Sequence, residues 1–213
     1  MKRFFILFVS VLLILSGCAG AQESSPEPTP TPEPTPEPVF ESGERNESQY
    51  TNTFLSLSFA LPENWTFASN KEFEELLGIG TQQLESNMQI AHTPGDSTFY
   101  EFYALGSAGE SVIMTVEDLS AHDGGESLSV EQFIDTLSTQ YNNITTVEYM
   151  VGDSYEQQLA SHDCMILPLS VEEAGVYQHN CVFRSGDYMV TITISAHSEE
   201  ELSSLFEQFS SNT

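Results

Sequence analysis

Two His-x-Cys triplets place side chains that could bind a metal ion or form a cross-link close together in the sequence: His162-Asp163-Cys164 and His179-Asn180-Cys181. They fall on extended segments, 155–170 and 176–184, that are predicted to pair as an antiparallel hairpin around 172–175. Side chains two residues apart share a face of a strand, and a loop of even length places all four on the same face. A two-residue loop sets the cysteines opposite each other, whereas a four-residue loop makes the pair diagonal.

Three interpretations of these four side chains stay open. The favoured one is a disulfide between Cys164 and Cys181, which suits an oxidising compartment and would close a loop of about 17 residues, worth about 3 kcal/mol. Two free buried thiols are the second. The third is a metal site formed by His162, Cys164, His179 and Cys181, because Zn²⁺ and copper accept these ligand types. Their spacing matches no established zinc-binding pattern, and we predict no bound metal.

The other residues with chemical potential form no recognisable site. The sequence contains no Gly-x-Ser-x-Gly elbow, no His-Glu-x-x-His, no phosphate-binding glycine loop and no EF-hand spacing. His92, His122 and His197 are interpreted as loop or cap residues. We therefore predict a protein that is not an enzyme and uses no cofactor.

Acidic residues far outnumber basic ones, with 32 Asp+Glu against 5 Lys+Arg and a formal net charge of -27. Lys2 and Arg3 lie in a segment that is predicted to be removed, and Arg45, Lys71 and Arg184 alone cannot form a basic patch. This excludes nucleic-acid binding through phosphates and docking on anionic lipid. The acids are spread along the chain, so a solvated surface is the default interpretation. The sharper alternatives are a surface for a basic protein and weak binding of divalent cations.

The first 17 residues have the features of a signal peptide. Lys2-Arg3 precede an apolar run, 4–15, of about 12 residues, which is shorter than the roughly 20 that span a bilayer. The run ends in Leu15-Ser16-Gly17-Cys18, which resembles the bacterial lipobox. This resemblance implies cleavage before Cys18, lipidation of its sulfur and anchoring on the extracytoplasmic face of the cell membrane. An ordinary signal peptide and an uncleaved anchor are the alternatives.

Residues 18–48 are predicted to be the lipidated cysteine and a disordered linker rich in Pro, Glu and Thr. Seven prolines stand at every second position from Pro26 to Pro38, and proline supports neither helix nor sheet there. The stretch 23–38 is expected to be a semi-rigid polyproline II spacer of about 50 Å. Residues 49–213 have the length of one globular domain.

The globular part combines both kinds of secondary structure. Apolar alternation predicts strands at 55–61, 99–105, 111–119, 145–151, 155–170, 176–184 and 188–195, with a short extended piece at 65–67 and a two-residue turn at Ser185-Gly186. Helices are predicted at 71–77, 81–87, 130–142 and from Ser198 to about Phe209, the last two opened by capping boxes at Ser129-x-x-Gln132 and Ser198-x-x-Glu201. This order predicts an α+β fold, a central antiparallel β-sheet flanked by helices in an α/β/α sandwich.

Both ends of this domain resemble PsbP/Mog1-like proteins. The opening carries Tyr50-Thr51-Asn52, the strand Leu57–Leu61 and then Pro62-Glu63-Asn64-Trp65, and the end carries a hairpin around Arg184–Tyr188 before a C-terminal amphipathic helix. The resemblance covers about 49–209. It implies a protein-binding module, as in a photosystem accessory subunit and a nuclear-transport GTPase cofactor, and it transfers no catalytic residue.

These observations predict a lipid-anchored extracytoplasmic protein that presents an acidic, non-catalytic domain to an envelope or extracellular protein. The alternative is a solute- or metal-binding lipoprotein that uses a sheet-face pocket or the hairpin of His162, Cys164, His179 and Cys181.

Overall fold

The computed structural model describes residues 39–69 and 97–212. The chain divides between Pro38 and Val39, and all elements described below belong to the unit that begins at Val39. The helices predicted at 71–77 and 81–87, the signal segment and the linker up to Pro38 lie outside the described residues. Within the described residues, no helix has both the length and the apolar character needed to cross a membrane.

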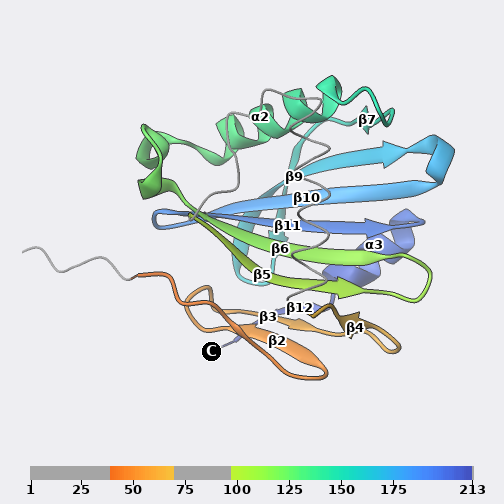
Figure 1. The fold of residues 1–213 in the computed structure, drawn as a ribbon, viewed down its shortest axis with the longest axis horizontal. Coiled ribbons are helices and arrows are strands. Elements are labelled where there is room, and N and C mark those ends of the chain that lie inside the picture. Colours follow the sequence, from red (N-terminus) through yellow and green to blue (C-terminus); the bar gives the residue numbers. More distant parts are fainter. Residues whose placement is uncertain (1–38, 70–96, 213) are drawn as a thin grey trace, which may run out of the picture. The chain divides into compact units, whose positions relative to one another are not determined.

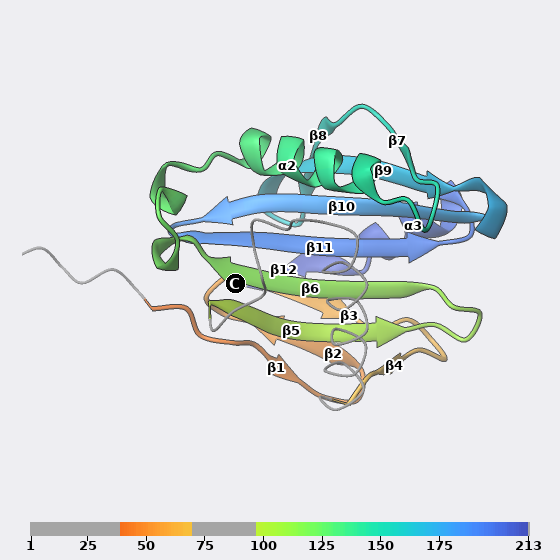
Figure 2. The same ribbon diagram turned by 45° about the horizontal axis from the view of Figure 1, so that its top comes forward.

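The larger sheet has eight strands, and every pairing in it is antiparallel (Figure 2). The strands are β4 Thr66–Phe67, β5 Thr98–Leu105, β6 Ser111–Asp118, β7 Met150–Val151, β8 Tyr155–Leu159, β9 His162–Val171, β10 Val176–Ser185 and β11 Tyr188–Ala196. Their order is β4-β5-β6-β11-β10-β9, and β9 pairs on its other side with both β7 and β8. Strand β9 therefore separates the interior of the sheet from its edge.

Most of the predicted strands of this sheet are confirmed, with differences at their ends. The strand predicted at 145–151 is reduced to β7, and the extended segment 155–170, expected in one or two pieces, forms the two strands β8 and β9. The turn predicted at Ser185-Gly186 is shifted by one residue, because Ser185 pairs with Tyr188 and leaves Gly186-Asp187 as the loop. Gly186 has a φ of 59°, a conformation that glycine adopts without strain.

A second, four-stranded sheet has the order β1-β2-β3-β12. Its strands are β1 Glu44–Arg45, β2 Gln49–Asn52, β3 Leu57–Ala60 and β12 Phe209–Ser211. Phe209 pairs with Phe59, so the last strand of the described chain joins the first ones. The pairing starts at Glu44, within the stretch that the sequence assigned to the linker, and Phe40 is already buried.

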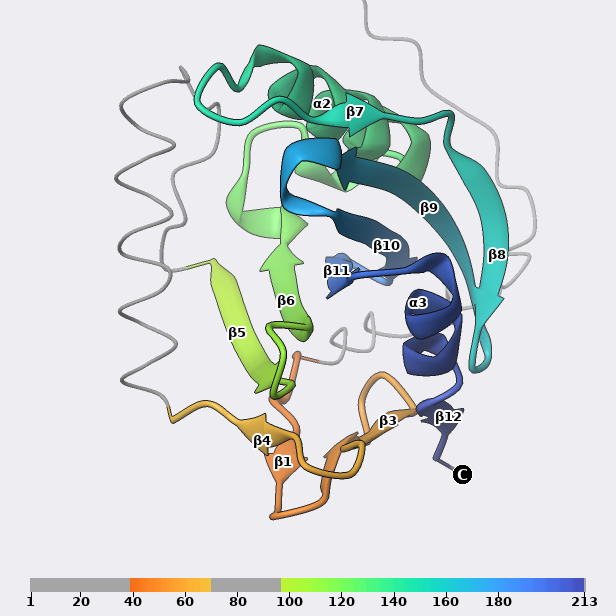
Figure 3. The same cartoon turned by 90° about the vertical axis from the view of Figure 1, so that its right-hand side faces the viewer.

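The prediction of a helix-flanked α/β/α sandwich is wrong. The described residues form twelve strands in two sheets and only two α-helices, α2 Val130–Asn143 and α3 Glu199–Phe206. Figure 3 shows α2 on one side of the larger sheet and the smaller sheet on the other. The chain ends α3 at Phe206 and returns as β12, because Phe209 is buried against Phe59 rather than on a continued helix. A second sheet therefore occupies the face where a helical layer was expected.

Two clusters of buried side chains lie on the two faces of the larger sheet. Alternation along β11 directs Val190, Ile192 and Ile194 into the larger cluster, which also contains side chains of the smaller sheet and α3. Met189 faces the opposite way, into the smaller cluster beneath α2. Helix α2 lies over β9 and β10 (Figure 1), whereas most side chains of β6 and β11 on that face are half-buried.

The helix starts follow the sequence closely. At Ser129 both halves of the capping box are present, since the Ser129 side chain accepts from the Gln132 amide and the Gln132 side chain accepts from the Ser129 amide. At Ser198 the hydroxyl accepts from the Glu201 amide, while the Glu201 carboxylate accepts from the amide of His197 instead. Three short 3₁₀ turns complete the described elements: η1 Leu119–Ala121, η2 Gly125–Ser127 and η3 Glu172–Ala174.

Candidate functional site

The register of the β9–β10 hairpin determines how the two His-x-Cys triplets meet. Val171 pairs with Val176, so the loop has four residues, and Gly175 closes it with a φ of 61°. Cys181 lies opposite Ile166, two residues from Cys164. The two cysteines are therefore diagonal neighbours, and both side chains belong to the larger buried cluster.

Both cysteines are free thiols enclosed in the core, with exposed fractions of 3% for Cys164 and 0% for Cys181. A hydrogen bond with Cys164 and then burial raise the pKa of the Cys181 thiol well above its usual range. The Cys164 thiol donates to the carbonyl of His162 at 3.5 Å. Diagonal neighbours are about 7–8 Å apart, longer than the usual spacing across a disulfide, so an S–S bond would draw the strands together. The disulfide stays a prediction.

His162 connects the larger sheet to the smaller one. Its Nε2 lies 2.7 Å from the carbonyl oxygen of Leu55, and because a carbonyl only accepts, Nε2 carries the hydrogen. The imidazole stacks on Phe183 with 4.2 Å between ring centroids and 16° between planes. These contacts use both the polar and the apolar surface of the ring, so His162 acts as a structural residue.

His179 lies in a different environment, between β8, β10 and α3. Its Nε2 is 3.6 Å from a carboxylate oxygen of Glu199, and its ring meets the ring of Tyr155 edge-on with 6.3 Å between centroids. Burial lowers the pKa of His179, and the charge of Glu199 only partly opposes this effect. We therefore treat His179 as neutral near pH 7, where the contact with Glu199 is polar rather than an ion pair. Within the described residues, its buried Nδ1 has no hydrogen-bond partner.

The same register keeps the two histidines apart. His179 pairs with Pro168, which is six residues from His162 along β9, so about 20 Å of strand separates them. Four ligands of one metal ion must lie within about 2–2.3 Å of it, which this separation does not permit. No group of three or more metal-ligating side chains is assembled in the described parts of the chain. The hairpin places the four residues on one face, as predicted, but does not bring them together.

The other side of β9 is organised around β8, which sequence reasoning did not single out. Leu159 pairs with His162, so the β8–β9 hairpin closes through the two-residue loop Ala160-Ser161, with Ala160 at a φ of 53°. Strand β8 is exposed from Tyr155 to Gln158, and only Leu159 is buried. Its sequence, Tyr-Glu-Gln-Gln-Leu, lies within the predicted extended segment 155–170 but is short and polar and carries no chemical motif.

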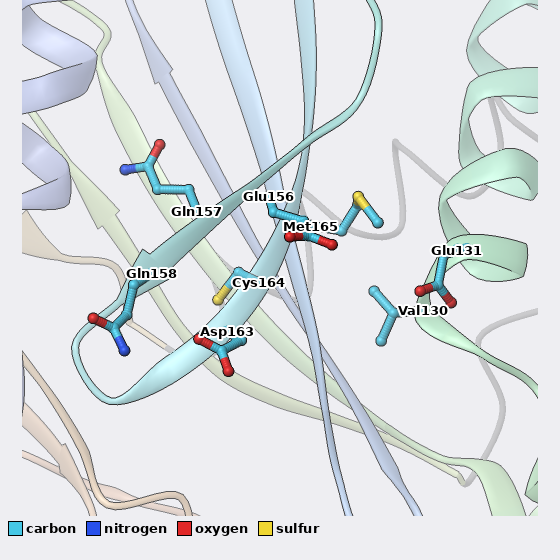
Figure 4. Close-up of a pocket in the computed structure, with 8 residues that line it drawn as sticks. All are labelled: Val130, Glu131, Glu156, Gln157, Gln158, Asp163, Cys164 and Met165. Atoms are coloured by element: carbon cyan, nitrogen blue, oxygen red, sulfur yellow. The ribbon is translucent and has the colours of Figure 1, made fainter.

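A cleft of about 450 Å³ lies between the β8–β9 hairpin and the N-terminal end of α2 (Figure 4). Its walls combine apolar and acidic side chains, among them Val130, Glu131, Glu156, Asp163 and Met165. In Figure 4, Glu156 and Met165 point from the strands toward α2, whereas Gln157 points away. None of the described residues that line the cleft is basic. The acidic cleft therefore offers negative charge and a small apolar floor beside an exposed strand.

Comparison with known proteins gives only distant likenesses. No family model matches the chain, and no curated protein matches it at a significant level. Among solved structures, the cyanobacterial PsbP of Synechocystis sp. PCC 6803 is similar at a TM-score of 0.47 and 11% identity, covering 84% of this chain and 98% of that one. A protein from Bacteroides thetaiotaomicron is similar at a TM-score of 0.39 and 7% identity, covering 78% of this chain and 49% of that one, so this chain spans about half its length. A PsbP-like protein is thus among the structural neighbours, and the functional argument rests on the chain's own residues.

Proposed function

We propose that this chain is a membrane-anchored extracytoplasmic lipoprotein whose acidic, non-catalytic domain binds another protein at the cell envelope. The observation that carries this proposal is the acidic cleft, where Glu131, Glu156 and Asp163 surround a partly apolar floor beside an exposed strand. Negative potential of this kind attracts cationic partners and repels acidic ones, while apolar contacts add to the affinity.

One of the few basic side chains among the described residues, that of Arg184, is held by backbone carbonyls. Arg184 donates to the carbonyls of Gly186, Leu128 and Glu126, so its guanidinium joins the β10–β11 loop to the approach to α2. Its distance to the carboxylate of Asp187 is 3.8 Å. The guanidinium is therefore committed to the fold, and the acidic excess of the sequence faces solvent as an attractive surface for a basic partner.

The side chains with catalytic potential are engaged in the fold. The thiols of Cys164 and Cys181 are buried beside each other, and His162 is bound to the Leu55 carbonyl and to Phe183. A nucleophile needs access to substrate and a nearby base, but both thiols lie inside the larger cluster and the ring of His162 is held by its own contacts. This arrangement supports a binding role rather than a catalytic one.

Anchoring is tested through Cys18. In cells that express the whole chain, a labelled fatty acid should be incorporated into the protein, and the protein should sediment with membranes. Cys18→Ser should abolish the labelling and release the protein from the membrane fraction. Equal labelling of the parent and Cys18→Ser would contradict lipidation at this residue.

Partner binding is tested by crosslinking on intact cells that express the whole chain. We expect a discrete crosslinked product that Glu156→Lys weakens, because the substitution reverses a charge within the cleft. Glu63→Lys is the matched control, since Glu63 is an exposed acid in the turn before β4, on the opposite edge of the larger sheet. Absence of any product with the parent chain, or the same product in both variants, would contradict a partner held by this cleft.

A further inference from the structure

Strand β8 is an open edge of the larger sheet. It pairs with β9 from Tyr155 to Leu159, and no other strand among the described residues pairs with it. Four of its five residues are exposed. An open edge of this length presents unpaired backbone donors and acceptors that another strand can use.

The register identifies which backbone groups are free. The two-residue loop makes Leu159 and His162 the closing pair of the hairpin, joined through their backbone groups. Hydrogen-bonded and non-hydrogen-bonded pairs alternate along antiparallel strands, so the N–H and C=O of Gln158 and Glu156 point away from β9. Both residues also line the acidic cleft, so the free backbone groups and the carboxylates occupy the same place.

Charge decides which occupant fits this edge. A strand laid beside β8 would be about 4.8 Å away, and its alternate side chains would face Glu156, Asp163 and Glu131 across the cleft. A second copy of β8 would bring its own Glu156 to these carboxylates, and like charges across a strand pair are destabilising. Lys or Arg at every second position would instead meet three acids.

We propose that β8 binds an extended, basic segment of a partner protein as an additional strand, with main-chain hydrogen bonds to Glu156 and Gln158 and basic side chains in the acidic cleft. This inference rests on the proposed partner-binding function and names the surface and the chemistry of the partner. Main-chain pairing provides the affinity, and the alternate basic side chains provide the specificity.

The test uses the whole chain in detergent and a seven-residue peptide with Lys at alternate positions and Val or Thr between them. Binding is followed by fluorescence anisotropy. A peptide of the same sequence with methylated backbone nitrogens on its pairing edge keeps the charge and loses the donors, so its affinity should fall at least about tenfold. Glu156→Gln should lower the affinity for the unmethylated peptide by about two- to fivefold, and this difference in affinity should disappear at high salt.

Gln158→Pro tests the edge from the side of the protein. Proline is tolerated at an edge strand where the N–H faces solvent, so the pairing of β8 with β9 is retained while an outward donor is lost. We expect at least about tenfold weaker peptide binding, whereas Glu63→Lys should change it less than twofold.

Strand addition would be overturned if the methylated and unmethylated peptides bound equally well. It would also be overturned if the Gln158→Pro variant bound the unmethylated peptide as tightly as the parent chain does, or if that peptide failed to bind the parent chain at millimolar concentration. Self-association of the chain that Gln158→Pro abolishes would assign the edge to a second copy and overturn the basic partner. If crosslinking on intact cells persists unchanged in Gln158→Pro, the edge proposal fails while the partner-binding function stands. If the parent chain gives no crosslinked product on intact cells, the proposed partner-binding function itself fails.

Discussion

Strand β9 has very different surroundings on its two sides, with β10 on one and with β8 and β7 on the other. On the β10 side, Cys181 packs beside Ile166 and Cys164 in the larger cluster, where the two thiols are enclosed. Toward β8, strand β9 borders an exposed strand, an acidic cleft and backbone groups without a described partner. The two sides are one strand spacing apart, about 4.8 Å.

This difference shows that a reactive residue type does not by itself indicate a functional site. The side with cysteines and histidines has the more reactive residue types, yet its polar atoms are largely engaged within the fold. The β8 side has only common polar residues, yet it keeps hydrogen-bonding capacity and uncompensated charge at the surface. Availability to a partner, rather than residue type, is what makes β8 the stronger candidate.

The largest effect is expected from a substitution on the β10 side. Phe183 is buried and supports the ring of His162, so Phe183→Ala should lower the free energy of unfolding by about 3–5 kcal/mol. On β8, Gln157→Ala removes an exposed side chain and should change it by less than about 0.5 kcal/mol. Urea unfolding measures both. A cost for Gln157→Ala near that for Phe183→Ala would show that β8 is not an open edge.

A hydroxyl in the interface between the two sheets should give the next largest effect. The Tyr50 hydroxyl donates to the carboxylate of Glu101 at 2.5 Å, and burial followed by the charge of Glu101 raises the pKa of Tyr50. Tyr50→Phe removes a donor to a buried carboxylate and should cost about 1.5–3 kcal/mol in urea unfolding. The control is Tyr177→Phe, at a tyrosine that is 37% exposed, which should be near neutral. Equal effects would contradict the importance of enclosure.

The reactivity of Cys164 and Cys181 tests whether the β10 side of β9 holds two buried free thiols. Because the pKa of Cys181 is raised and both thiols are buried, the folded chain should react with iodoacetamide at pH 8 at least about tenfold more slowly than the unfolded chain. Mass spectrometry after unfolding counts the labelled cysteines. If neither Cys164 nor Cys181 is labelled until a reductant is added, the disulfide predicted from the sequence is present, and the hairpin must depart from the diagonal spacing described above.

The smallest effect is expected at the far end of the β9–β10 hairpin. The two ring nitrogens of His197 lie 3.1 Å from the Ala108 carbonyl and 3.3 Å from the Gly175 carbonyl, so both must carry hydrogen to donate. The Ala108 and Gly175 carbonyls, with Glu110 and Glu201 nearby, raise the pKa of His197.

A raised pKa in the folded state fixes the sign of the pH dependence. The contribution of His197 is complete below the pKa of an unfolded histidine and is lost as pH rises through the raised value. NMR titration of the His197 ring should show a pKa above the ordinary value, and His197→Gln should remove this part of the pH dependence. A pKa at or below the ordinary value would contradict the two-carbonyl contact.

Local patterns in the sequence predicted much of the larger sheet. Alternation located the long strands, and Ser129-x-x-Gln132 located the start of α2, because these signals arise from neighbouring residues. The smaller sheet was missed as a unit because Phe209 pairs with Phe59 across 150 residues, and no local pattern encodes such a pairing. That long-range contact is also what ended the predicted last helix early.

The candidate site was predicted only in part, for a related reason. The sequence placed His162, Cys164, His179 and Cys181 on one face and left the loop length open, and the loop length decides the pairing. Strand β8 carries no chemical motif, so its importance depends on which edge of β9 it occupies and on the position of α2. Both depend on tertiary packing.

The most direct test of the central claim is hydrogen–deuterium exchange at the backbone amides of the whole chain, alone and with the alternating lysine peptide. The account predicts rapid exchange at Glu156 and Gln158 in the chain alone, slow exchange at Cys181, and clear slowing at Glu156 and Gln158 when the peptide is added. Slow exchange at both β8 amides without the peptide, or no change with it, would contradict an open edge that receives a partner strand.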